Sequence, residues 1–213
     1  CSEDVLKLKL EKEPRAVSDS SGKKEGDPVN LIVVGEFSSL LAAFVTRWDE
    51  TETTGLQSSI KTVKSFVLGS EYRYSPVSPL FMYGRSQDFA LQRARGSINQ
   101  RLHLRLWLSP MQFEEKPVWV GQVSRDIGVR LAMVFPGTTH KIDPYVDEAR
   151  DYVVADLIKA GHVDRFAYVG GVGESKAENP RGNLTGDPYV TNGRRAVIIL
   201  SPAKTANPKL LDW

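Results

Sequence analysis

The sequence predicts an α+β fold, with a single mixed, mainly antiparallel sheet and helices packed mostly on one face. Between residues 101 and 108, polar or aromatic side chains alternate strictly with four leucines, which is typical of a strand with one buried face. Further strands are expected from Val118 and from Val129, with no helical pattern between them. Strands that follow one another without crossover helices favour antiparallel pairing over a doubly wound sheet.

The elements before this strand are expected in the order strand, helix, helix, strand. Residues 29–35 form an apolar run typical of a buried strand, and residues 38–48 carry apolar side chains at helical spacing. A second helix is predicted for 58–69, and a short strand for 80–83. Residues 84–92 are expected to contain one helical turn.

The strand at 101–108 and the strand from Val118 are expected to form a hairpin. In that hairpin Trp107 would lie opposite Trp119, a pair that contributes up to about 1 kcal/mol. Gly121 would then lie near Arg105 and leave room above the sheet.

One helix is expected after the strands. Asp143 and Pro144 are suited to its N-cap and its first position, and Gly161 is suited to its C-terminal end. A strand at 165–171 follows, then a long loop at 173–188 and a last strand at 196–201. The glycine-rich run at 170–173 is expected to be a turn, because no helical pattern follows it as a nucleotide-binding motif would require.

Composition limits the class of protein. The 213 residues are 41% hydrophobic, enough for one sizeable core, and the net charge of +2 comes without a basic block, so no nucleic-acid partner is predicted. No run of about twenty apolar residues is present. The single cysteine, Cys1, excludes an internal disulfide framework and a multi-cysteine metal site.

The first 27 residues are expected to be a tether that packs little against the folded part. They are rich in charged residues, Ser, Gly and Pro, and a cysteine stands first, as in a processed bacterial lipoprotein. A lipid on Cys1 would attach the protein to a membrane surface, in the outer membrane or on the outer face of the inner membrane. The alternative is that the sequence starts at an arbitrary point. The folded domain would then cover 28–204, with a polar tail at 205–213.

Several short runs occur in a fixed order between residues 28 and 200. They are Pro-Val-Asn-Leu at 28–31, Tyr-Ser-Pro-Val-Ser-Pro-Leu at 74–80, Tyr-Gly-Arg-Ser-Gln-Asp at 83–88, His-Leu-Arg-Leu-Trp at 103–107, Val-Trp-Val-Gly at 118–121, Arg-Asp-Ile-Gly at 125–128 and Thr-His-Lys-Ile-Asp-Pro at 139–144, followed by Asp147 and by Arg-Asp at 150–151. Together they resemble the LssY carboxy-terminal domain family.

The resemblance implies a cell-envelope setting, because members often carry this domain beside membrane-embedded modules of the DedA-like or lipid-phosphatase-like kind. It implies no particular reaction. Tyr145 stands where the family usually has an acidic residue, which argues against a dense carboxylate metal site.

Six polar residues are expected to converge in one pocket at the edge of the sheet. They are His103, Arg105, Arg125, Asp126, His140 and Asp143. Simpler explanations exist for several of them: Arg125 and Asp126 can form an ion pair, Asp143 can cap the helix, and His103 can be a half-buried side chain bonded to a neighbour.

Two functions fit these residues. The first is a binding module for an anionic ligand, such as a phosphorylated lipid headgroup or a glycan. Arg105 and Arg125 would bind the charge, the helix N-terminus would add its positive dipole end, and Trp107 and Trp119 would lie beside the ligand.

The alternative is a hydrolase acting on an envelope phosphoester or lipid. His103 or His140 would be the general base, and Asp126 or Asp143 a metal ligand or an orienting group. No cofactor is predicted, although a divalent metal would be compatible with this second function. The binding module is favoured because no Gly-x-Ser-x-Gly, phosphate-loop or dinucleotide motif is present.

Overall fold

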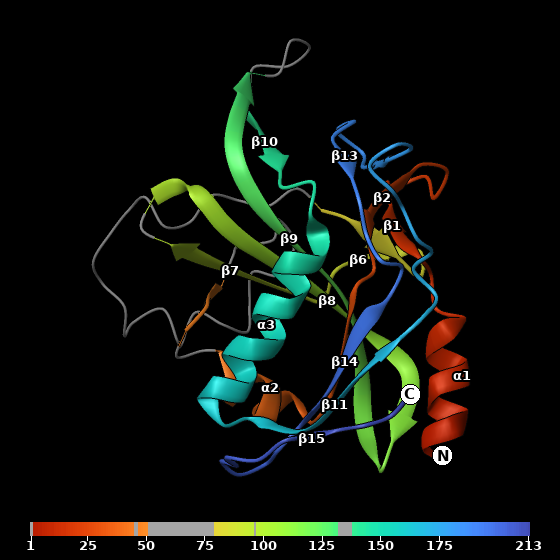
Figure 1. Ribbon diagram of the computed structural model, residues 1–213, viewed down its shortest axis with the longest axis vertical. Helices are drawn as coiled ribbons and strands as arrows, with labels where there is room; N and C mark the ends of the chain where they lie inside the picture. Colours follow the sequence, from red (N-terminus) through yellow and green to blue (C-terminus); the bar gives the residue numbers. More distant parts are fainter. Residues whose placement is uncertain (1, 45–46, 51–78, 96, 132–137) are drawn as a thin grey trace.

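A computed structural model describes residues 2–44, 47–50, 79–95, 97–131 and 138–213. It confirms the α+β class: the described residues form a mixed nine-stranded sheet, two smaller sheets and three helices (Figure 1). The elements are α1 (Glu3–Glu11), β1 (Ala16–Ser18), β2 (Glu25–Pro28), β3 (Leu31–Val34), α2 (Phe37–Phe44), β4 (Asp49–Glu50), β5 (Phe81–Met82), β6 (Arg85–Ser86), β7 (Phe89–Arg95), β8 (Ser97–Phe113), β9 (Lys116–Leu131), β10 (Thr138–Ile142), α3 (Val146–Ala160), β11 (Val163–Val169), β12 (Arg181–Gly182), β13 (Pro188–Tyr189), β14 (Arg195–Leu200) and β15 (Lys209–Leu210).

The large sheet is built around two long strands. Its order is β15-β11-β14-β3-β9-β8-β7-β4, and β10 also pairs with β9. The β3–β14 and β11–β15 pairs are parallel and the others are antiparallel. β8 and β9 have 17 and 16 residues, and β9 continues with β10 beyond the rest of the sheet, as the upper arm in Figure 1.

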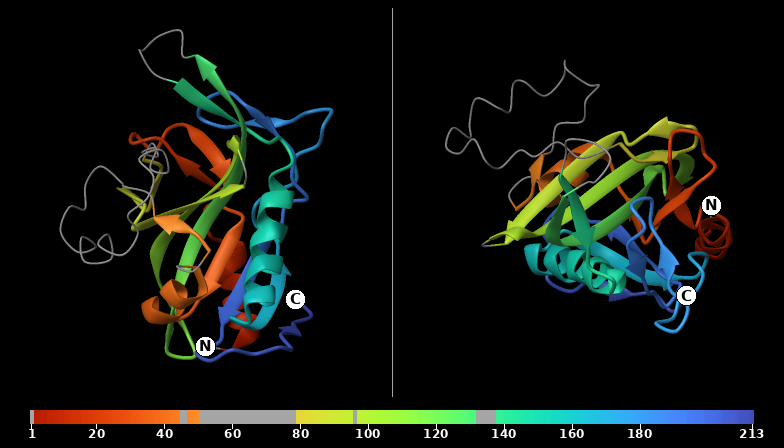
Figure 2. Two further views of the ribbon diagram at one scale, coloured as in Figure 1. Left: turned by 90° about the vertical axis from the view of Figure 1, so that its left-hand side faces the viewer. Right: turned by 90° about the horizontal axis from the view of Figure 1, so that it is seen from above.

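The leucine alternation predicted the two faces of β8 correctly. Leu102, Leu104 and Leu106 belong to one core cluster, which also contains buried side chains of α2 and α3. Figure 2 shows α3 lying against this face of the sheet. Trp107 belongs to a second core cluster on the opposite face, together with Leu6 of α1 and other side chains from β1, β3, β5 and β14.

The expected register of the hairpin is wrong by one residue. Trp107 lies opposite Val120, and Trp119 lies opposite Leu108, so the two tryptophans point to opposite faces and cannot stack. Gly121 faces the leucine side rather than the polar side. A Cβ there would come within 2.7 Å of the Leu106 side chain, so the glycine makes room for a leucine and not for a ligand.

The first 27 residues pack against the domain, contrary to the expected tether. α1, β1 and β2 lie here, and Leu6, Leu10 and Val17 are fully buried. Leu6 and Leu10 are four positions apart, so a short helix presents both to the same core. The Ser2 side chain caps α1 by accepting a hydrogen bond from the Val5 N–H. Cys1 lies outside the described residues.

Four further expectations need correction. Residues 84–92 contain β6 and the start of β7 instead of a helical turn, and the loop at 173–188 contains β12 and the start of β13. The predicted strand from Val129 is the end of β9. The expected tail at 205–213 contains β15. The predicted helix at 58–69 lies outside the described residues.

The packing of α1 gives a direct test. We expect Leu6→Ala to lower the free energy of unfolding by about 2–5 kcal/mol, because it removes a fully buried side chain. Leu8→Ala is the matched control on the same helix, where the side chain is 57% exposed, and should change stability by less than about 0.5 kcal/mol. Urea denaturation of both variants measures the difference, and equal effects would contradict the packing of α1.

Candidate functional site

One face of β8 and β9 carries a layer of buried polar side chains. Arg105 lies opposite Gln122, His103 lies opposite Ser124, and Arg101 lies opposite Asp126. All six are at most 7% exposed, and Gln92 of β7, opposite His103, is buried with them. Buried polar groups are costly unless they are hydrogen-bonded, so such a layer on one sheet face is the main candidate for a site.

His103 and Asp126 form the closest contact in this layer. The His103 Nε2 atom lies 2.6 Å from the Asp126 Oδ2 atom, and both side chains are buried. The pair is diagonal across the two strands, since Ser124 is the residue directly opposite His103. A buried histidine oriented by a carboxylate is suited to proton transfer, and it is also a common structural pair.

Arg105 and Gln122 form a second pair in the same layer. The Arg105 Nη1 atom donates to the Gln122 Oε1 atom at 3.1 Å. Arginine can only donate, so this bond fixes which end of the amide is the oxygen. The Gln122 Nε2 group is then a buried donor, and it has no acceptor among the described residues.

Asp27 of β2 belongs to the same cluster. It accepts a hydrogen bond from Asn183 Nδ2 at 3.1 Å. Burial raises the pKa of the Asp27 carboxyl, and Arg105 and Asn183 offset this only in part. Burial likewise lowers the pKa of Arg105, and the charges of Asp27 and Asp126 oppose the shift.

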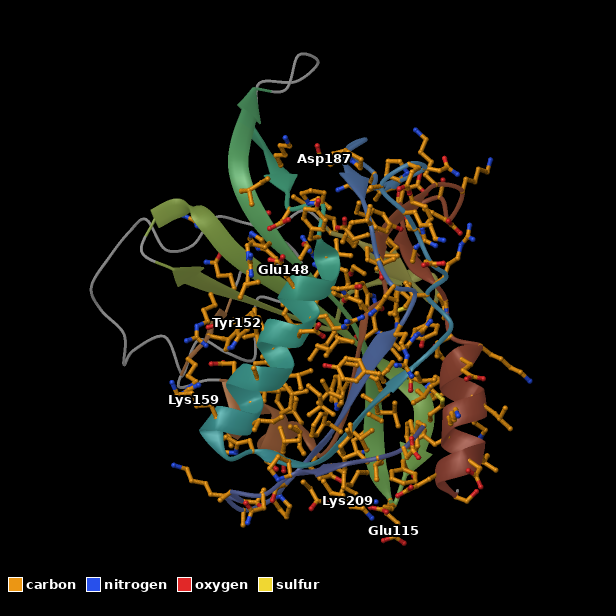
Figure 3. All side chains as sticks on the ribbon, in the orientation of Figure 1. Glu115, Glu148, Tyr152, Lys159, Asp187 and Lys209 are labelled. Atoms are coloured by element: carbon orange, nitrogen blue, oxygen red, sulfur yellow. The ribbon has the colours of Figure 1, made fainter. Side chains whose placement is uncertain are left out.

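The segment from Asn183 to Asp187 connects this cluster to β10. Asp187 is buried, and its Oδ2 atom accepts from the Ile142 N–H at 3.4 Å and from the Thr185 hydroxyl at 3.1 Å. Figure 3 shows Asp187 near β13, at the end of the molecule where the β9–β10 arm leaves the sheet. The polar layer of β8 and β9 is thus bordered by β2 and by this segment.

Arg125 and Asp143 lie on the other face of the sheet. Arg125 is opposite Leu102, and its Nη1 atom lies 3.4 Å from Asp143 Oδ2 and 3.3 Å from Glu148 Oε2. Glu148 is labelled at the start of α3 in Figure 3. Asp143 is not the N-cap of α3, which begins at Val146, but its Oδ1 atom accepts from the Tyr145 N–H in a turn just before the helix.

The six predicted residues therefore do not converge. His103, Arg105 and Asp126 share the polar face, whereas Arg125 and Asp143 are on the helix face. Neighbouring residues of a strand point to opposite faces, so Arg125 and Asp126 could not both reach one pocket. His140 is paired with Val129 in β10, and its side chain lies outside the described residues.

Both tryptophans proposed to lie beside a ligand are core residues. The Trp107 indole N–H donates to the Arg85 carbonyl at 3.3 Å, and the Trp119 indole N–H donates to the Gly35 carbonyl at 3.1 Å. Both side chains are buried and on opposite faces of the sheet. They therefore support the core around the polar layer instead of lining one ligand.

A comparison with protein families gives a match along most of the chain. The model of the LssY C-terminus matches residues 10–194, from the end of α1 to the residue before β14. The chain belongs to this family. No curated protein and no solved structure matches the chain. The polar layer is thus part of the LssY C-terminal domain itself.

Two kinds of feature, a metal-ligand cluster and a membrane-spanning helix, were sought in the described part of this LssY C-terminal domain. Within it, no three His, Cys, Asp or Glu side chains are grouped so that they could hold a metal ion. Among the helices of the same part, none is long and apolar enough to cross a membrane.

Sequence reasoning missed Asp27, Gln122 and Asn183. Gln122 could have been found by extending the alternation of β8 to β9 in the correct register, since it lies directly opposite Arg105. Asp27 had no such signal, because it follows a charged stretch that looked like a tether. Asn183 lies in a loop whose position over β2 depends on tertiary structure alone.

The raised pKa of Asp27 gives a prediction about pH. A carboxyl whose folded-state pKa exceeds its unfolded value stabilises the fold only while it is protonated, so its contribution is lost as the pH rises through the folded pKa. We expect Asp27→Asn to raise the free energy of unfolding at pH 7, where the unfolded chain gains from ionising a carboxyl that burial keeps neutral in the fold, and to have little effect below the ordinary pKa of an aspartate. Denaturation series at several pH values measure this, and a variant that is less stable than wild type at pH 7 would contradict it.

Proposed function

We propose that this LssY C-terminal domain binds a small anionic ligand on the polar face of β8 and β9, such as a phosphorylated lipid headgroup or a glycan with anionic groups. The observation that carries the proposal is the Gln122 amide. Its orientation is fixed by Arg105, it is fully buried, and its N–H groups have no acceptor among the described residues. An oxygen atom of a ligand would satisfy this donor beside a guanidinium.

The charges around Gln122 support an anion as the occupant. Arg101 and Arg105 are both buried on this face, while Asp126 is engaged by His103 at 2.6 Å. Burial favours the neutral form of the Asp27 carboxyl, because it raises its pKa. A ligand with negatively charged oxygens would therefore meet two buried arginines on this face.

An envelope setting and a lipid on Cys1 belong to the same proposal. α1 begins at Glu3, capped by Ser2. A lipid on Cys1 would therefore hold the folded domain directly at the membrane surface, with no flexible tether between them. Headgroups in that surface would then be close to the domain at high local concentration.

Binding to the polar face can be tested with three variants. We expect Arg105→Gln to weaken binding of a phosphorylated headgroup such as glycerol phosphate by about 1.5–3 kcal/mol, and Gln122→Met to weaken it by about 1 kcal/mol. Arg125→Gln is the matched control, because Arg125 lies on the other face of the sheet, and its binding should be unchanged. Calorimetric titration of the folded variants measures these effects. Equal losses in all three variants, or no binding by wild type to a panel of anionic headgroups and glycans, would contradict the proposal.

The His103–Asp126 contact favours one alternative, a hydrolase acting on an envelope phosphoester or lipid. An aspartate 2.6 Å from Nε2 would fix the tautomer and orientation of the imidazole, so that His103 could act as a general base. A divalent metal would be compatible with this alternative, although the described residues contain no group of three His, Cys, Asp or Glu side chains that could hold one.

The two functions predict different effects of the same substitutions. For a hydrolase, we expect His103→Gln and Asp126→Asn each to lower turnover of a phosphoester or ester panel by about 10²–10⁴-fold, because proton transfer is lost. For a binding module, wild type shows no turnover, and the two variants bind the headgroup within a few-fold of wild type. Turnover that survives both substitutions would exclude the His103–Asp126 mechanism.

A further inference from the structure

Another buried arginine, Arg195, lies outside the polar layer of β8 and β9. Arg195 is the first residue of β14, and it is 0% exposed. Its Nη2 atom donates to the backbone carbonyls of Glu13 and Pro14, at 3.3 and 3.5 Å. Its Nε and Nη1 atoms have no acceptor among the described residues. A guanidinium has five N–H donors, so the three on these two atoms are unused.

Arg150 shows what a fully partnered buried arginine looks like in this protein. Its side chain is also buried, but its Nε atom donates to Asp151, and its Nη1 atom donates to Asp147, Asn192 and the Arg194 carbonyl. Arg195 makes no such ion pair with any carboxylate of the described residues. Burial lowers the pKa of Arg195 to about 10, and the charge of Glu13 only partly opposes this.

The carboxylate whose charge acts on Arg195 is already engaged by another group. Glu13 accepts a hydrogen bond from the hydroxyl of Tyr83. Tyr83 has a φ of 55° in the turn between β5 and β6, a left-handed conformation that is unfavourable for a tyrosine. The strained turn thus directs the hydroxyl to Glu13, and the carboxylate does not neutralise the arginine by direct contact.

The glycine-rich turn after β11 lies over the Arg195 side chain. Gly171 is exposed and has a φ of 104°, and a Cβ at this position would lie 3.0 Å from Arg195 Nη2 and 2.5 Å from the Glu11 carbonyl. Only a glycine allows the chain to pass this close. A Cβ at the preceding Gly170 would meet nothing within 4 Å, so the turn is open on the side that Gly170 faces.

We propose that Arg195 is the charged contact of a second site, which binds a small oxyanion of the phosphate type beneath the Gly170–Gly171 turn. The three unused N–H donors would bind its oxygens. The contacts to Glu13 and Pro14, in the segment that follows α1, use Nη2 alone, so they leave the rest of the guanidinium for the anion. The site is on β14, two strands from β9 in the sheet order, and the proposal does not depend on the function proposed for Arg105 and Gln122.

Inorganic phosphate can serve as the ligand in a binding test, and the NMR resonance of the arginine Nε–H group reports its binding directly. The protein is labelled with ¹⁵N in its arginines, and the Nε–H resonance of Arg195 is assigned by its absence from the NMR spectrum of Arg195→Lys. We expect this resonance to shift saturably as phosphate is added at constant ionic strength. Calorimetry of Arg195→Gln should show phosphate binding at least about tenfold weaker than in wild type. Glu13→Gln should bind phosphate a few-fold more tightly, because the nearby negative charge is removed.

Two control variants separate this site from other effects. Arg150→Gln removes a buried arginine whose donors are satisfied, and Arg105→Gln removes the charge of the other site; both should retain the shift of the Arg195 resonance. No shift with phosphate, or equal phosphate affinity in wild type, Arg195→Gln and Glu13→Gln, would overturn the proposal. If Arg195→Gln does not fold, Glu13→Gln and the resonance of wild type still decide the question.

Discussion

The pairing of β8 with β9 determines which side chains of this domain can meet. Along a strand, neighbours point to opposite faces, so one register places Leu102, Leu104 and Leu106 under the helices and His103 and Arg105 on the other side. A shift of one residue on either strand would exchange these sets and bury charges against α2 and α3. The fold and the polar layer therefore depend on the same register.

The two faces hold their charged groups in different ways. On the helix face, Asp156 of α3 binds Arg47 at 2.6 Å and Arg93 of β7 at 2.5 Å, and its second oxygen also accepts from the Trp48 indole at 3.3 Å. Both oxygens of this carboxylate have partners, and the contacts join α3 to β7 and to the segment that follows α2. On the opposite face, Gln122 and Arg195 keep buried donors without acceptors among the described residues. Buried donors of that kind reduce stability, which is why they indicate ligands better than the saturated groups do.

The sequence was sufficient for the fold class and for the two faces of β8, because the alternation over 101–108 is a local pattern. It was not sufficient for the register. The β8–β9 turn uses Glu114 and Glu115 with φ values of 49° and 63°, where glycine or asparagine would have been recognisable, and an irregularity between Leu108 and Gln112 changes the pairing. The candidate site was half predicted: His103, Arg105 and Asp126 share a face, but Asp27 and Gln122 become part of it only through tertiary contacts.

The position of β3 has a consequence for the order of folding. This strand lies inside the sheet between β9 and β14, and Leu31 pairs with Ala196. The interior of the sheet is therefore incomplete until the last strands of the chain have been synthesised, and α1 also packs in a cluster with Leu211. Pairing between such distant segments is slow to form. We therefore expect this domain to remain incompletely folded during synthesis until the segment that carries β14 and Leu211 has emerged from the ribosome.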